Sequence, residues 1–159
     1  MRTAVVFYSL DGNCAFVAEE IKTVLNADLF RLQLKNGKKR GKAGNMIRGC
    51  LMVFSGKKPP LKPYSFDPAA YDLIVIGAPV WAGRPAPVLR AFFSETKITG
   101  KKTALFVCHG GGMGKALERF KSMVSGNEII AITGFNSPAK CGCGEMKKQI
   151  ADWAKTLNG

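Results

Sequence analysis

The sequence predicts an α/β protein in which a five-stranded parallel sheet lies between two layers of helices, a three-layer α/β/α sandwich. Five short apolar runs rich in β-branched and aromatic residues alternate with amphipathic segments of helical period. Three of these runs end in loops of small, polar or glycine residues. Right-handed crossovers place such loops at one edge of the sheet, and a doubly wound strand order of 2-1-3-4-5 makes all three neighbours. Ligands bind at that edge in this fold class.

Length and composition narrow the class of protein. The chain of 159 residues fits one domain, residues 1–159, which would bury roughly two-thirds of its unfolded surface. No apolar run approaches the ~20 residues of a membrane span, and no signal-like segment opens the chain. We therefore expect a cytoplasmic protein without membrane insertion. The net charge of +13 favours anionic ligands or partners of any kind.

The first strand is expected at Thr3–Tyr8, a run typical of a strand buried on both faces. A polar turn over residues 9–14 follows and opens an amphipathic helix. Such a turn aims unpaired backbone amides and the positive end of the helix dipole at one point, which suits an anion such as phosphate. An ordinary strand-to-helix turn, with Asp11 or Asn13 as cap and Gly12 at positive φ, explains the same residues.

A strongly basic segment follows a second strand, which we expect at residues 28–34 on an edge of the sheet. Residues 31–62 contain ten Lys and Arg residues and no Asp or Glu. Asn45 is a candidate cap of a short helix docked on the core, and the three prolines of residues 59–63 predict an extended connector. Aromatic residues are not interleaved with the cations, so a solvated basic face is favoured over a nucleic-acid site.

The third strand is expected at residues 72–78, whose continuous apolar centre is typical of an interior parallel strand. A loop of small residues and prolines, residues 79–87, comes next and contains Trp81. On a stiff loop the indole could offer a flat face to a ligand, or it could cap the core. Pro85 and Pro87 suit the first turn of the helix that follows.

The fourth strand, expected at residues 103–107, runs into residues 108–114, a loop with four glycines. These glycines either let the backbone approach a ligand closely or form a flexible connector. The loop contains His109, the single histidine, which could hydrogen-bond a ligand, deliver a proton, or simply face solvent. A fifth strand at residues 128–133 and a final helix complete the alternation.

With these loops in this order, the chain resembles the flavodoxin family over essentially its whole length. The most specific segments are residues 8–14 and residues 77–87. The resemblance implies non-covalently bound FMN, with the indole of Trp81 stacked on the isoalloxazine ring. The implied phosphate loop consists of Ser9, Leu10, Asp11, Gly12, Asn13 and Cys14. The implied loops beside the ring consist of Pro79, Val80, Trp81, Ala82 and Gly83, and of Cys108, His109, Gly110, Gly111, Gly112 and Met113.

Two residues of the implied phosphate loop depart from the family pattern, which usually has hydroxyl residues at these positions. Cys14 offers only a weak thiol donor. Asp11 adds a negative charge beside the expected phosphate, and at about 4 Å with an effective dielectric near 20 the repulsion is roughly 4 kcal/mol. Family members are generally acidic whereas this chain is basic, so we expect a redox partner protein with an acidic docking surface.

The cysteines support weaker hypotheses. Five cysteines in a chain without a secretion signal are expected to be thiols. Cys141 and Cys143 could form a redox pair or bind a metal, but their spacing and the lack of a second ligand pair nearby favour two loop thiols. Cys14, at a helix N-terminus, could have a lowered pKa and be reactive, although the family places a phosphate-binding side chain there.

The resulting hypothesis is an FMN-binding protein that transfers electrons between protein partners. One alternative is an FMN-dependent NAD(P)H oxidoreductase that acts on a small acceptor such as a quinone. Another is a flavodoxin fold without cofactor that serves as a binding module. No protein nucleophile or general base is required for the redox hypotheses, because the cofactor supplies the redox chemistry, and we predict no metal site.

Overall fold

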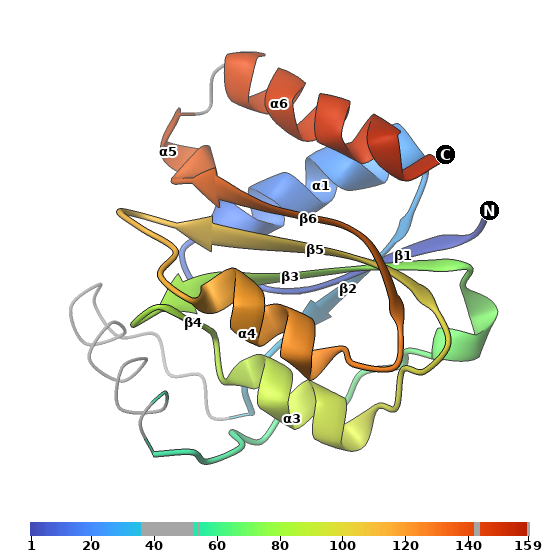
Figure 1. Cartoon of the computed structure of the whole chain (residues 1–159), viewed down its shortest axis with the longest axis vertical. Coiled ribbons are helices and arrows are strands. Elements are labelled where there is room, and N and C mark those ends of the chain that lie inside the picture. The colour runs from blue at the N-terminus through green and yellow to red at the C-terminus, as the bar shows by residue number, and fades with distance from the viewer. Residues whose placement is uncertain (36–52, 54, 142–143, 159) are drawn as a thin grey trace.

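The fold is a parallel sheet covered by helices on both faces (Figure 1). The computed structural model describes residues 1–35, 53, 55–141 and 144–158. The parallel strands run β2-β1-β3-β5-β6, which is the predicted order 2-1-3-4-5 once the short antiparallel β4 is set aside. These strands are β1 (Thr3–Tyr8), β2 (Asp28–Leu32), β3 (Leu73–Trp81), β5 (Lys102–His109) and β6 (Glu128–Asn136).

Two layers of helices enclose the sheet (Figure 1). One face is covered by α1 (Asn13–Leu25), α5 (Pro138–Cys141) and α6 (Gly144–Lys155), and the other by α3 (Val88–Glu95) and α4 (Ala116–Met123). Two short 3-10 segments are η1 (Pro68–Ala70) and η2 (Thr156–Asn158). None of the described helices is long and apolar enough to cross a membrane.

Two apolar clusters form the core, one on each face of the sheet, because the central strands are buried on both sides. The cluster beneath α1 and α6 includes Ile21 and Phe106, and the cluster beneath α3 and α4 includes Phe92 and Phe120. Gly77 lies in the middle of β3, where a Cβ would sit 1.9 Å from Cζ of Phe106. The aromatic ring therefore fills the space that any side chain at position 77 would need.

Some boundaries differ from those predicted. β2 ends earlier than expected and β6 runs further. The additional strand β4 (Arg84–Pro85) pairs with the end of β3 in antiparallel register. Pro85 therefore lies in a strand rather than in the first turn of α3, whose N-cap is Pro87. The helix predicted after Asn45 lies outside the described residues.

Candidate functional site

The site residues predicted from the sequence lie at the C-terminal edge of the sheet, in three loops and in the ends of the strands and the helix that adjoin them. The loops follow β1, β3 and β5, which are neighbours in the sheet. The parallel registers set the strand ends side by side, since Phe7 lies beside Gly77 and Pro79 beside Cys108. The predicted meeting of the three loops at one edge is confirmed.

The turn after β1 is a compact connection into α1. Gly12 is the N-cap, with φ of 92°, and the helix begins at Asn13. The Asp11 carboxylate folds onto the helix end, where it accepts the Asn13 backbone N–H at 3.2 Å and the Asn13 side-chain amide at 2.7 Å. Asn13 Oδ1 in turn accepts the Ala139 amide at 2.9 Å, which ties the turn to α5. Asp11 thus satisfies the first amide of α1 and places its charge at the positive end of the helix.

Ser9, the first residue of this turn, has a buried hydroxyl without a partner. The residue is 6% exposed, and its Oγ makes no hydrogen bond to the described part of the chain. Its carbonyl oxygen accepts from Nη2 of Arg31 on β2 at 3.3 Å. Because buried polar atoms are normally hydrogen-bonded, this hydroxyl is available to a ligand at the turn.

Arg31 is a residue of the site that the sequence motifs do not predict. It is one of ten cations in residues 31–62, so the local sequence does not single it out. Its strand pairs with β1, and its own register partner is Phe7. The predicted strand order could have indicated Arg31, because in that order the C-terminal end of β2 adjoins the C-terminal end of β1 and the turn that follows it.

The second loop is shorter than predicted, because β3 continues through Trp81. The carbonyl of Pro79 accepts the Ala86 amide at 3.0 Å, so this proline lies inside the sheet despite its missing N–H. Ala82 and Gly83, with φ of 47° and 67°, turn the chain back into β4. Two successive left-handed residues are typical of tight β-hairpins, since their twist matches that of the strands. The predicted stiff loop is therefore corrected to a strand end and a hairpin.

Trp81 is half-buried at the rim of the site. Its ring meets the ring of Tyr8 edge-on, with centroids 5.8 Å apart and an interplanar angle of 88°. Tyr8 is 5% exposed, so the contact anchors the indole to the end of β1. The indole thus packs against the core and still has exposed surface for a flat ligand.

His109 is the last residue of β5 and has the second unpaired polar atom of the site. Its Nδ1 is buried and has no hydrogen-bond partner among the described residues. Its carbonyl oxygen accepts the Ser137 amide at 2.8 Å, which fixes the end of β5. Gly110, Gly111 and Gly112 follow as an exposed segment. A Cβ on Gly111 or Gly112 would meet no atom within 4 Å, so no protein contact requires glycine there.

The loops after β3 and β5 contact each other. A Cβ on Gly114 would lie 3.2 Å from Cα of Gly83, so the two backbones are close together. Arg119 of α4 donates from Nη1 to the Gly83 carbonyl at 3.2 Å. Met113 packs over Gly134 of β6, where a Cβ would lie 2.1 Å from the Met113 sulfur. These contacts hold the two loops in a fixed relation, as a largely pre-formed ligand site requires.

Cys14 and Cys108 are buried free thiols within the core beneath α1. Burial raises the pKa of the Cys14 thiol well above its usual range, and the neighbouring Cys108 and the charge of Asp11 raise it further. This shift is opposite to the lowering that a reactive thiol needs. The Cys14 side chain lies in the core, so this residue offers the turn its backbone amide. Cys141 is exposed, and Cys143 lies outside the described residues.

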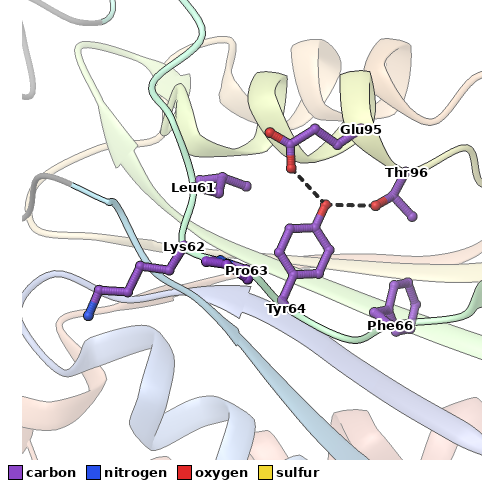
Figure 2. Close-up of a pocket in the computed structure, with 7 residues that line it drawn as sticks. All are labelled: Leu61, Lys62, Pro63, Tyr64, Phe66, Glu95 and Thr96. Atoms are coloured by element: carbon purple, nitrogen blue, oxygen red, sulfur yellow. Dashed lines mark hydrogen bonds between the residues drawn. The ribbon is translucent and has the colours of Figure 1, made fainter.

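A surface pocket of about 410 Å³ lies between the connector before β3 and the C-terminal end of α3 (Figure 2). It is lined by Leu61, Lys62, Pro63, Tyr64, Phe66, Glu95 and Thr96. The Tyr64 hydroxyl donates to Glu95 Oε2 at 3.2 Å and lies 2.7 Å from Thr96 Oγ1, so the connector before β3 is fastened to the C-terminal end of α3. None of the site residues predicted from the sequence lines this pocket.

The strand order and the loops after the first, third and fourth parallel strands define an α/β protein of the flavodoxin type. Residues 2–155 match the family model described as flavodoxin. The chain therefore belongs to the flavodoxin family, as the sequence resemblance predicts. No curated protein shows a significant match to the chain.

Solved structures of similar fold come from several bacteria. A flavoprotein from Lactobacillus acidophilus NCFM in complex with FMN has 23% sequence identity and a TM-score of 0.73, over 87% of this chain and 96% of that chain. A protein from Bacteroides uniformis ATCC 8492 has 19% identity and a TM-score of 0.82, over 97% of each chain. The two-electron reduced flavodoxin of Megasphaera elsdenii has 20% identity and a TM-score of 0.57, over 94% of this chain and 98% of that chain. At these identities the similarity establishes the fold.

Proposed function

We propose that the chain binds FMN at the C-terminal edge of the sheet and transfers electrons between protein partners. The observation that carries this proposal is a pair of buried, unpaired polar atoms, Ser9 Oγ and His109 Nδ1. Within the described residues they are the two buried side-chain polar atoms without a partner, and they lie at the ends of β1 and β5. FMN has phosphate oxygens and a polar ring edge that could pair with both.

The residues of the site suit this cofactor. Ser9 Oγ and the remaining amides of the turn would bind the phosphate, because a helix N-terminus favours an anion. Trp81 would contact the isoalloxazine ring with its exposed surface, and His109 would hydrogen-bond the polar edge of the ring. When bound, FMN supplies the electron-transfer chemistry, whereas these residues bind and orient it. The similarity to the FMN complex of the Lactobacillus acidophilus flavoprotein supports the proposal.

A titration of the apoprotein with FMN and with riboflavin, followed by quenching of flavin fluorescence, tests the proposal. We expect one FMN per chain and weaker binding of riboflavin, which lacks the phosphate. Ser9→Ala should weaken FMN binding about two- to tenfold through the lost hydrogen bond, and leave riboflavin binding unchanged. Ser122→Ala is the control, because this hydroxyl donates to a carbonyl within α4. Failure of the wild-type protein to bind either flavin would overturn the proposal and favour a cofactor-free binding module.

Turnover separates an electron carrier from an FMN-dependent NAD(P)H oxidoreductase. The FMN-loaded carrier should oxidise NADPH only slowly when no partner protein is present. Steady NADPH consumption with a quinone as the sole acceptor would favour the reductase instead.

The redox partner in this proposal is a protein with an acidic docking surface. Cations border the site, including exposed Lys115 before α4, exposed Lys140 on α5 and half-buried Arg84 of β4. The net charge of +13 adds longer-range attraction toward an acidic surface. A cytoplasmic setting is part of the same proposal, and the free thiols of Cys14 and Cys108 support it.

A further inference from the structure

Arg31 places a positive charge at the turn after β1. Its Nη2 donates to the carbonyl oxygen of Ser9 at 3.3 Å. The residue stands beside Phe7 in the strand register, so its side chain extends past this pair toward the turn. The hydrogen bond is partly buried while the residue as a whole is exposed, so the guanidinium remains accessible to a ligand.

No carboxylate of the described residues forms an ion pair with Arg31. The ion pairs of the described residues are Arg2–Asp28, Lys147–Glu20 and Lys155–Asp152. The acidic residue of the turn, Asp11, is hydrogen-bonded to Asn13 instead. A guanidinium has five N–H groups, and within the described part of the chain Arg31 uses one of them, on Ser9, so it keeps donors for an added anion.

Ser9 gives an independent indication that an anion belongs at this position. Its hydroxyl is buried and unpaired, and its carbonyl oxygen is the atom that holds Arg31. Ser9 thus has an unpaired hydroxyl, and its carbonyl oxygen holds the guanidinium of Arg31 nearby. A phosphate bound here would accept a neutral hydrogen bond from the hydroxyl and a charge-assisted bond from the guanidinium, which is the stronger of the two.

We propose that Arg31 binds the phosphate of the flavin and compensates the negative charge of Asp11. This inference rests on the proposed FMN function and adds a residue from outside the phosphate loop. Asp11 alone would make the turn repel a phosphate dianion, whereas Asp11 and Arg31 together leave no net side-chain charge on it. The preference for FMN over riboflavin then depends on Arg31, and it increases as the phosphate loses its second proton near pH ~6.

The test compares FMN and riboflavin affinities of the full chain and three variants, by quenching of flavin fluorescence at several NaCl concentrations. Arg31→Gln removes the charge and Arg31→Lys keeps it. Lys102→Gln removes an exposed charge at the first residue of β5, at the opposite end of the sheet. We expect Arg31→Gln to weaken FMN binding about 10- to 100-fold, Arg31→Lys by less than about fivefold, and Lys102→Gln by less than about twofold. Riboflavin binding should not change.

Salt and pH separate a charge effect from a structural role of Arg31. In the wild-type protein FMN binding should weaken as salt is added and strengthen from about pH 5 to about pH 7, and both trends should be smaller in Arg31→Gln. Equal losses of FMN and riboflavin binding, equal effects of Arg31→Gln and Lys102→Gln, or no rescue by Arg31→Lys would overturn the proposal. Wild-type protein that binds neither flavin is a different result, because it overturns the FMN function and the role of Arg31 with it.

Discussion

Replacing Asp11 by Asn tests the electrostatics of the turn with little change in shape. Asn keeps an oxygen for the Asn13 backbone amide, which lies 3.2 Å from Asp11 Oδ1, and removes the negative charge. It loses the bond from the Asn13 side-chain amide at 2.7 Å. The apoprotein should therefore become less stable, by about 1 kcal/mol, because a hydrogen bond and a favourable charge at the helix N-terminus are both lost.

The same substitution should tighten FMN binding. A phosphate oxygen on a neighbouring amide of the turn would lie about 3 Å from that nitrogen, which sets the two negative charges roughly 6 Å apart. Asp11 is exposed, and an effective dielectric of about 50 at that distance gives a repulsion of about 1 kcal/mol for each negative charge on the phosphate. This is less than the roughly 4 kcal/mol expected from the sequence for a closer, less solvated pair. Asp11→Asn should then bind FMN at least about sixfold more tightly.

Two assays measure the expected loss of stability and the expected gain in FMN affinity. Urea unfolding of the apoprotein gives the loss of stability, and fluorescence titration at low salt gives the FMN and riboflavin affinities. Asp67→Asn is the matched control, because Asp67 accepts the Ala69 amide at 2.9 Å at the start of η1 and lies outside the three loops. Unchanged or weaker FMN binding by Asp11→Asn, or an equal gain for riboflavin, would refute the repulsion argument.

Two further predictions concern the fold. Gly77→Ala should destabilise the protein by about 1–3 kcal/mol in urea unfolding, because its Cβ would lie 1.9 Å from the buried Phe106 ring. Gly134→Ala is its control and should be milder, since the end of a flexible methionine can move aside; equal losses would contradict the packing argument. Burial, followed by the hydrogen bond to Asp28, raises the pKa of Tyr71. The contribution of the Tyr71 hydroxyl to the free energy of unfolding is present below about pH 10 and is lost as pH rises through the raised pKa. Tyr71→Phe should therefore be less stable than wild type at pH 8, and the difference in stability should shrink at alkaline pH. A difference that stays constant with pH would show that the ionisation of Tyr71 does not affect stability.

The order of elements could be predicted because the apolar runs and the amphipathic segments differ in period. The hairpin of β3 and β4 could not, because Ala82 adopts a left-handed conformation that alanine rarely takes and that no turn motif marks. Pro79 favours a loop when judged locally, whereas pairing with β5 keeps it in the sheet. Tertiary pairing outweighs local preference at both positions.

The loops of the candidate site could be located from the sequence, but the environment of their side chains could not. Residues 9–14 have the composition of an anion turn, yet the sequence does not reveal that the Cys14 thiol is buried while the Ser9 hydroxyl is left unpaired. Arg31 reaches the turn from a neighbouring strand, and contacts of this kind depend on register rather than on a motif. The sequence also does not reveal the bonds of Asp11 to Asn13, which determine how strongly its charge acts on a ligand.

A crystal structure of the protein grown with FMN would test the central claim most directly. We predict a phosphate within hydrogen-bonding distance, about 3 Å, of Ser9 Oγ, and an isoalloxazine ring that contacts Trp81 and hydrogen-bonds His109 through its polar edge. FMN bound elsewhere, for example in the pocket beside Tyr64, would contradict it. Crystals without FMN from a solution that contains a large excess of the cofactor would contradict it as well.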